Sequence, residues 1–234
     1  MGRGWINAIR EVNAAKKGKI FTKLSREITV SVKIGGPDPD ANSRLRMALK
    51  DARTQSMPRD TIERAIKKGT GEGGDDNYEE LTYEGYGPHG VALLVETLTD
   101  NKNRTVQDLR AMFVRGGGNL GESGSVLWMF DKIGSIIAKA EKDGLDAEEA
   151  AINAGADEVD ELDDGQFQFI CDPQEVDAVQ SALSEGEGWN VLKYEISYRP
   201  KTPQDLSEEQ ENDLRTLMDK LEDHDDVKKI HLSV

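Results

Sequence analysis

Apolar and basic residues follow one another at helical spacing between Lys16 and Lys33. At about 100° per residue, one side of a helix over this stretch is apolar and carries Ile20, Phe21, Leu24, Ile28 and Val32. The opposite side presents only cations, namely Lys19, Lys23, Arg26 and Lys33. The pattern predicts an amphipathic helix with one face in a core and one positively charged face.

Helical spacing extends through the first 69 residues. A short helix with Trp5, Ile6, Ile9 and Val12 on its apolar side is predicted to end near Gly18, before a second helix over residues 19–34. Asp40 or Asn42 can cap the next helix, and Pro58 suits the first position of a further helix that ends at Gly69. These residues therefore predict an all-α module.

Beyond a linker at residues 72–77, the periodicity becomes mixed. Strands are predicted at residues 81–84, 91–98, 125–130, 134–138, near 159, 167–171, 191–198 and 227–234. Helices are predicted at residues 104–114, 146–154, 173–183 and 207–222, the last opened by a capping box of Ser207 and Gln210. Residues 132–200 read β, α, β, β, α, β, the order of a ferredoxin-like domain.

The predicted fold class is therefore α+β, with an N-terminal basic helical bundle followed by two ferredoxin-like α+β domains, one inserted in the other. The expected domains are a basic helical domain at 1–75, an α+β domain formed by 76–131 and 201–234, and an inserted α+β domain at 132–200.

Charge is distributed unevenly between these segments. The whole chain has a formal net charge of −15. Residues 1–69, however, contain 16 Lys and Arg against 7 Asp and Glu, a net charge of +9, and the remainder holds −24. Such asymmetry favours a basic module that binds a polyanion, beside an acidic remainder that maintains solubility.

The cations of this module are the candidates for contacts with nucleic acid. They are Lys16, Lys17, Lys19, Lys23, Arg26, Lys33, Arg46, Lys50, Arg53, Lys67 and Lys68. The simpler interpretation is that they form solvated helix faces, because Lys and Arg are common at the surface. The charge asymmetry favours the functional interpretation.

A glycine run at residues 116–121 matches the dinucleotide-binding pattern GxGxxG. That pattern requires a strand before the glycines and a helix after them, whereas here a predicted helix precedes them and a strand follows. A helix stop is the simpler interpretation. The alternative is a loop that holds a phosphate of a nucleic acid, with candidate residues Arg104, Arg115, Gly117, Gly118 and Asn119.

No catalytic or metal site is expected. The three histidines are far apart in sequence, and no nucleophile has an evident base. The acidic run at 157–164 lacks the spacing of a calcium loop, and the single cysteine, Cys171, permits neither an internal disulfide nor a CxxC site. We expect no cofactor, no small-molecule substrate and no membrane partner, because no apolar run approaches the length of a membrane span. A cytoplasmic protein is expected.

Several motifs together resemble the YebC family. They are the run Gly18 to Leu24, the segment from Met57-Pro58 to Lys68-Gly69, the turn Tyr83 to Pro88, the segment Thr97 to Thr105, and Gly117 to Val126 with Phe130. The resemblance implies a helical N-terminal domain and two ferredoxin-like domains. It also implies a non-enzymatic regulator of gene expression that binds DNA.

The resemblance leaves two alternatives open. Some members of the family act at the ribosome, and the mitochondrial relative is a translational activator, so ribosomal RNA is an alternative partner for the same basic face. In a third interpretation, the −24 portion of the chain binds a basic protein partner.

Overall fold

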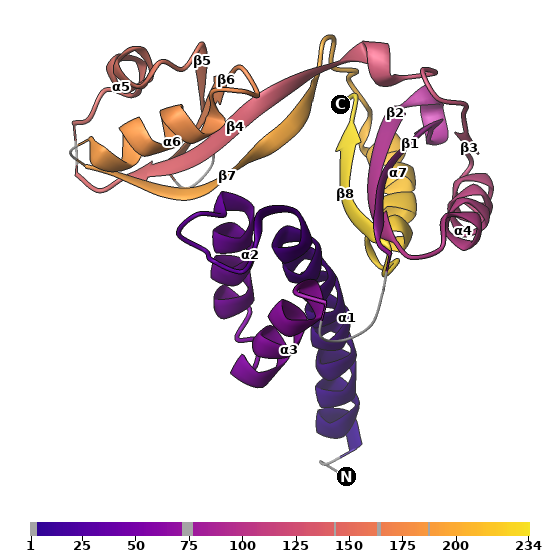
Figure 1. Ribbon diagram of the computed structural model, residues 1–234. Coiled ribbons are helices and arrows are strands. Elements are labelled where there is room, and N and C mark those ends of the chain that lie inside the picture. The colour runs from indigo at the N-terminus through magenta and orange to yellow at the C-terminus, as the bar shows by residue number, and fades with distance from the viewer. Residues whose placement is uncertain (1–3, 72–76, 143, 163–164, 187) are drawn as a thin grey trace. The chain divides into compact units, whose positions relative to one another are not determined.

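The computed structural model describes residues 4–71, 77–142, 144–162, 165–186 and 188–234, and for residues 4–16 it describes the backbone alone. The chain forms two compact units (Figure 1). The first unit comprises Met1–Leu127, Gln204–Leu232 and Val234, and the second comprises Trp128–Pro203 and Ser233. In sequence, the second unit is therefore inserted into the first.

One continuous helix, α1, runs over Gly4–Gly35. The prediction of two helices that meet near Gly18 is therefore wrong. Glycine costs a helix interior about 1 kcal/mol relative to alanine, but unlike proline it keeps the backbone N–H that the helix needs. The Thr22 hydroxyl also donates a hydrogen bond of 3.0 Å to the Gly18 carbonyl oxygen. Gly18 thus weakens the helix without ending it.

Two shorter helices, α2 (Ser43–Thr54) and α3 (Arg59–Gly69), pack against α1. The predicted apolar face of α1 contributes buried Ile28 and Val32 to their common core. The other buried members of this core are Leu45, Ala48, Leu49, Ala52, Met57 and Ala65. Phe21 and Leu24 of the predicted apolar stripe pack partly buried against this core, whereas Ile20 is exposed.

The ends of α2 and α3 are set by local chemistry. The Asn42 side chain accepts a hydrogen bond of 3.0 Å from the Leu45 backbone N–H and so caps α2. Asn42 is one of the two residues predicted for this cap. Pro58 precedes α3 as its N-cap residue, so the prediction that it takes the first helical position is off by one residue. At Gly69, a Cβ atom would lie 2.5 Å from the Val32 Cβ, so a glycine lets α3 end against α1.

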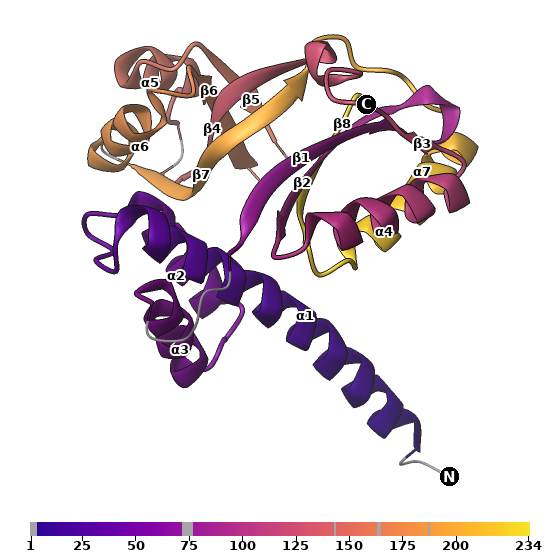
Figure 2. The same ribbon diagram turned by 45° about the vertical axis from the view of Figure 1, so that its right-hand side comes forward.

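The rest of the first unit is an antiparallel sheet with helices along one face (Figure 2). The strands, in the spatial order β3-β1-β2-β8, are β3 (Asn119–Leu120), β1 (Glu79–Tyr86), β2 (Ala92–Thr99) and β8 (Val227–Leu232). A 3-10 turn at Pro88–Gly90 joins β1 to β2, and the helices are α4 (Lys102–Arg115) and α7 (Glu208–Glu222). Sheet and helices share one core, which includes Leu93, Val95, Leu109, Phe113, Leu217 and Leu221. The predicted capping box of Ser207 and Gln210 opens α7.

A strand predicted at residues 125–130 is absent from the structure. A 3-10 turn at Leu127–Met129 takes its place, and the next strand begins only at Phe130. The buried Glu84 carboxylate accepts hydrogen bonds from the backbone N–H groups of Gly124, Val126 and Leu127 at 2.6 to 2.8 Å. Because these donors are committed to a side chain, the apolar run SVLWMF cannot use them in a strand ladder.

The second unit has the ferredoxin-like element order that was predicted. Its elements are β4 (Phe130–Ala140), α5 (Ala147–Ala154), β5 (Glu158–Glu161), β6 (Gln166–Cys171), α6 (Val176–Glu185) and β7 (Trp189–Pro200). They form an antiparallel sheet of order β5-β6-β4-β7. Its core includes Phe169 and Trp189, whose rings pack edge to face with centroids 5.2 Å apart. The α+β fold class is thereby confirmed, while the predicted boundaries of three domains stay a prediction.

Candidate nucleic-acid interface

The basic face of α1 contacts a turn of the same unit. This acidic turn is residues 222–226, with the sequence EDHDD, between α7 and β8. The Lys19 ammonium donates to Asp223 Oδ2 at 2.5 Å, and the Lys23 ammonium donates to the Glu222 carbonyl oxygen at 2.5 Å. Burial lowers the pKa of Lys23, although the neighbouring carboxylates oppose this shift. Lys19 and Lys23, which are predicted to face a nucleic acid, thus bind another segment of the same chain.

Asp226, the last residue of the acidic turn, is buried among side-chain donors from three elements. Arg26 Nη1 on α1 lies 2.5 Å from Asp226 Oδ1, and Arg104 Nη2 on α4 lies 3.0 Å from Oδ2. The hydroxyls of Thr99 and Thr105 donate to Oδ2 at 3.2 and 2.8 Å. Burial raises the pKa of this carboxyl, but the hydrogen bonds outweigh burial and hold its pKa below the ordinary value. Arg26 therefore has a buried anionic partner.

A cavity of about 460 Å³ beside the acidic turn brings together cations from separate parts of the sequence. Lys19 and Arg26 come from α1, and Arg104 comes from the start of α4. Lys220 of α7 also lines this cavity, although sequence reasoning did not include it among the candidates. The carboxylates that line the same cavity are Asp223, Asp225 and Asp226. The cavity is thus lined by both cations and carboxylates.

The outer face of α2 carries three exposed cations. We name Arg46, Lys50 and Arg53 the α2 ridge; all three are exposed and lie at i, i+4 and i+7. Within the described part of the chain, neither Arg46 nor Arg53 forms an ion pair. The buried residues of α2 lie on its other face, so the ridge is held outward by the packing of the helix.

The remaining predicted cations are distributed over α1 and α3. Lys17 and Lys33 are exposed on α1, and Lys67 is exposed on α3. The Lys68 ammonium lies 5.8 Å from the centre of the Tyr78 ring, in cation–π geometry. The side chain of Lys16 lies outside the described residues. The predicted set is therefore carried by all three N-terminal helices.

The amides of the glycine run bind backbone oxygens at the end of α4. The N–H of Gly117 donates to the Val114 carbonyl oxygen at 3.3 Å, and that of Gly118 donates to the Phe113 carbonyl oxygen at 2.8 Å. These amides close the end of α4, with Gly117 at a φ of +78°, as the helix-stop interpretation expects. Asn119 pairs with β1 as part of β3.

The two arginines proposed for that loop do not converge either. Arg104 stands in the first turn of α4 and Arg115 is its last residue. At 1.5 Å of rise per residue, their Cα atoms are separated by roughly 16 Å along the axis. Arg104 binds Asp226, as described above, and Arg115 is exposed.

Sequence reasoning missed a second set of charges that connects the helices to the sheet. Arg44 of α2 binds Glu27 of α1 through Nε at 2.6 Å and also pairs with Glu80 of β1. Lys228 of β8 lies 3.2 Å from the Glu27 carboxylate. Burial raises the pKa of Glu27, but these cations lower it more. Nothing in the local pattern indicates these pairs, because their members are far apart in sequence.

Two family descriptions match nearly the whole sequence. Residues 3–72 match the description "TACO1/YebC protein N-terminal domain", and residues 78–234 match "TACO1/YebC second and third domain". The chain belongs to the TACO1/YebC family.

Relatives within this family are similar over nearly their full length. A protein of Bdellovibrio bacteriovorus named probable transcriptional regulatory protein is 49% identical over 235 residues, with 100% of each chain covered. A protein of the same name from Geobacter sp. is 48% identical over 217 residues, covering 93% of this chain and 87% of the relative. The crystal structure of a conserved hypothetical protein from Aquifex aeolicus has a TM-score of 0.81 at 38% identity, covering 93% of this chain and 90% of that one.

Two features of the described residues bear on metal and thiol chemistry. They contain no group of three or more His, Cys, Asp or Glu side chains arranged to hold a metal ion. Burial raises the pKa of the Cys171 thiol to about 11, so this cysteine is not a thiolate at neutral pH. Across the described residues, no helix is both long enough and apolar enough to span a membrane.

Proposed function

We propose that this protein regulates gene expression by binding DNA through the cations of its N-terminal helices. The observation that carries the proposal is the α2 ridge, since Arg46, Lys50 and Arg53 are exposed on one helix face within a segment of net charge +9. Lys and Arg that face solvent can neutralise phosphates and release their counterions. The names of the bacterial relatives, probable transcriptional regulatory proteins, support the same role. The proposal requires no cofactor or membrane and places the protein in the cytoplasm.

The α1 face takes part in a second step. Lys19, Lys23 and Arg26 contact carboxylate or carbonyl oxygens of the acidic turn, and DNA phosphates present the same kind of acceptor. We infer that the α2 ridge binds first and that the α1 cations bind phosphate only where the acidic turn releases them. Interactions with phosphates position the protein on DNA and do not select a sequence.

The test is the salt dependence of binding to a DNA duplex. Replacing Arg46, Lys50 and Arg53 by alanine should weaken binding and lower the slope of log K against log salt by about 0.9 for each phosphate that is no longer neutralised. The control replaces Lys132, Lys139 and Lys201 by alanine, which removes the same charge from exposed positions in the second unit. An unchanged slope in the α2 ridge variant, or an equal change in the control, would exclude the ridge as the interface.

The ribosomal alternative is separated by sedimentation of a lysate on a sucrose gradient at physiological salt. A regulator that acts on DNA stays near the top of the gradient. Migration with ribosomes that is abolished in the α2 ridge variant would contradict DNA as the partner. No observation on the described residues favours that alternative, which stays a prediction.

A further inference from the structure

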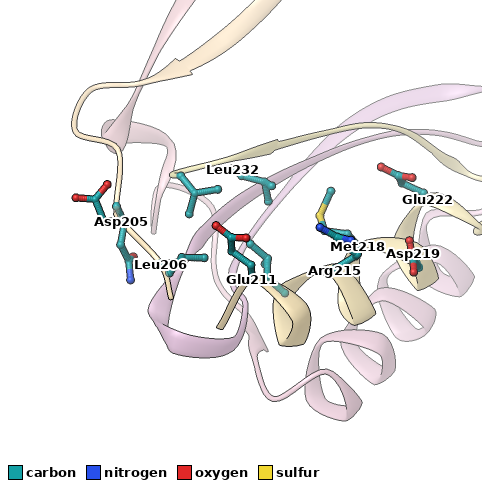
Figure 3. Close-up of a pocket in the computed structure, with 11 residues that line it drawn as sticks. Asp205, Leu206, Glu211, Arg215, Met218, Asp219, Glu222 and Leu232 are labelled. Carbon is teal, nitrogen blue, oxygen red and sulfur yellow. The ribbon is translucent and has the colours of Figure 1, made fainter. Parts of the chain in front are cut away.

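A groove lies between the outer strand of the first sheet and α7. It has a volume of about 560 Å³ and is lined by side chains from α7, from the end of β8 and from the segment at residues 204–206 (Figure 3). All of these residues belong to the first unit. The groove therefore does not depend on the placement of the second unit.

The floor of the groove is apolar. It is formed by partly buried Leu206, Met218 and Leu232 with buried Leu214 beneath them. These side chains lie at the open edge of the core shared by α4, α7 and the sheet. A peptide side chain placed on them would remove apolar surface from water.

The rim of the groove is acidic. Asp205, Glu211, Asp219 and Glu222 line it, against a single cation, Arg215. In the described residues, Asp205, Glu211 and Asp219 form no ion pair. The groove thus presents several carboxylates without compensating partners, around an apolar floor.

Strand β8 contributes to the same groove. Leu232, at the end of β8, lines the groove together with the side chains of α7. The apolar floor and the acidic rim therefore occur together along one side of the unit.

We propose that this groove docks a segment of a partner protein in which lysine or arginine residues alternate with apolar residues. The apolar side chains cover Leu206, Met218 and Leu232, and the basic side chains reach Glu211 and Asp219 of the rim. Charge complementarity selects this occupant, because an acidic or neutral segment would leave the rim carboxylates unpaired. The proposal does not rest on DNA binding, which uses other residues.

The test is fluorescence anisotropy with a labelled eight-residue peptide of alternating lysine and leucine, at physiological salt. Replacing Glu211 by glutamine and Asp219 by asparagine should weaken binding about fivefold, the scale of exposed charge pairs. A matched control, Glu148→Gln with Glu149→Gln, removes the same charge from the exposed first turn of α5 and should change affinity less than about twofold. Equal losses in both variants would show general attraction to an acidic protein and overturn the proposal.

The apolar floor of the groove is tested with substitutions that leave the net charge unchanged. Met218→Gln should weaken the same peptide about threefold, because Met218 is partly buried against the core and its thioether contributes apolar surface. Thermal unfolding shows whether this variant folds, and Leu206→Ala serves as a second variant of the floor. Unchanged affinity in both folded variants would overturn the docking site.

Two further measurements distinguish peptide docking in this groove from binding by the α2 ridge and from self-association. The α2 ridge variant should bind the peptide as the wild type does, so failure of the DNA proposal leaves this test intact. Sedimentation of the protein alone should show no association through the groove. A dimer that the Glu211 and Asp219 substitutions abolish would identify a second copy as the occupant and overturn the proposal.

Discussion

Arg26 and Asp226 are 200 residues apart in the sequence, yet the arginine Nη1 lies 2.5 Å from the Asp226 carboxylate. The exposed fraction is 16% for the Arg26 side chain and 2% for that of Asp226. This pair attaches α1 to the start of β8. Arg26 is predicted to face a nucleic acid, but in the structure it takes part in an internal contact of the first unit.

We predict that Asp226→Asn destabilises the protein by about 3 kcal/mol, because removing one member of a buried ion pair leaves Arg26 without a carboxylate partner. Denaturant unfolding measures this loss. Asp225→Asn is the matched control, since Asp225 is exposed and stability should change by less than about 0.5 kcal/mol. Equal stability of wild type and Asp226→Asn would show that the pair does not hold the unit together.

Glu84 should make stability depend on pH. Burial raises the pKa of its carboxyl, but hydrogen bonds from the N–H groups of Gly124, Val126 and Leu127 lower it below the ordinary value. The unfolded chain therefore takes up the proton more readily. The contribution of Glu84 is complete at neutral pH and is lost as the pH falls from about 4.5 through the lower pKa of the folded state.

Glu84→Gln tests this contribution. At pH 7 we expect it to cost about 1 to 3 kcal/mol, because a side-chain amide cannot accept from three N–H donors as a carboxylate does. The loss of unfolding free energy between pH 7 and pH 3 should then be smaller in the variant than in the wild type. A pH profile of unchanged shape would contradict the role assigned to Glu84.

Neutralising the acidic turn should strengthen DNA binding. Asp223→Asn with Asp225→Asn weakens the hold on Lys19 and Lys23, so phosphates compete more easily for these cations. We expect affinity for a duplex to rise about threefold in a binding titration. The Glu148→Gln, Glu149→Gln control changes net charge equally, so a rise of the same size there would indicate long-range repulsion and not competition.

Gly18→Ala should stabilise the protein by about 0.5 to 1 kcal/mol, because alanine favours a helix interior and a Cβ atom at Gly18 meets no heavy atom within 4 Å. Denaturant unfolding and helical circular dichroism measure the effect. Gly36→Ala is the contrasting variant, because the φ of +84° at Gly36 disfavours a side chain. Destabilisation by Gly18→Ala would show that α1 is interrupted after all.

The local sequence pattern predicted the exposed cations of α2, but it did not predict the partners of the α1 cations. Helical spacing placed Arg46, Lys50 and Arg53 on one solvent face, where the structure has them. The same reasoning predicted an open face at Lys19, Lys23 and Arg26, but their partners lie about 200 residues away in the chain. A helical wheel identifies the side of a helix that is charged, and it carries no information on distant segments.

The sequence by itself determined the α+β class, the amphipathic α1 and the capped starts of α2 and α7, because each depends on spacing or hydrogen bonds within a few residues. Only the tertiary structure decided that α1 continues through Gly18 and that Gly124, Val126 and Leu127 donate their N–H groups to Glu84. It likewise decided that Asp226 unites α1 with α4. Long-range hydrogen bonds and ion pairs set the positions of Glu84 and Asp226, and their energies depend on which buried groups the fold brings together.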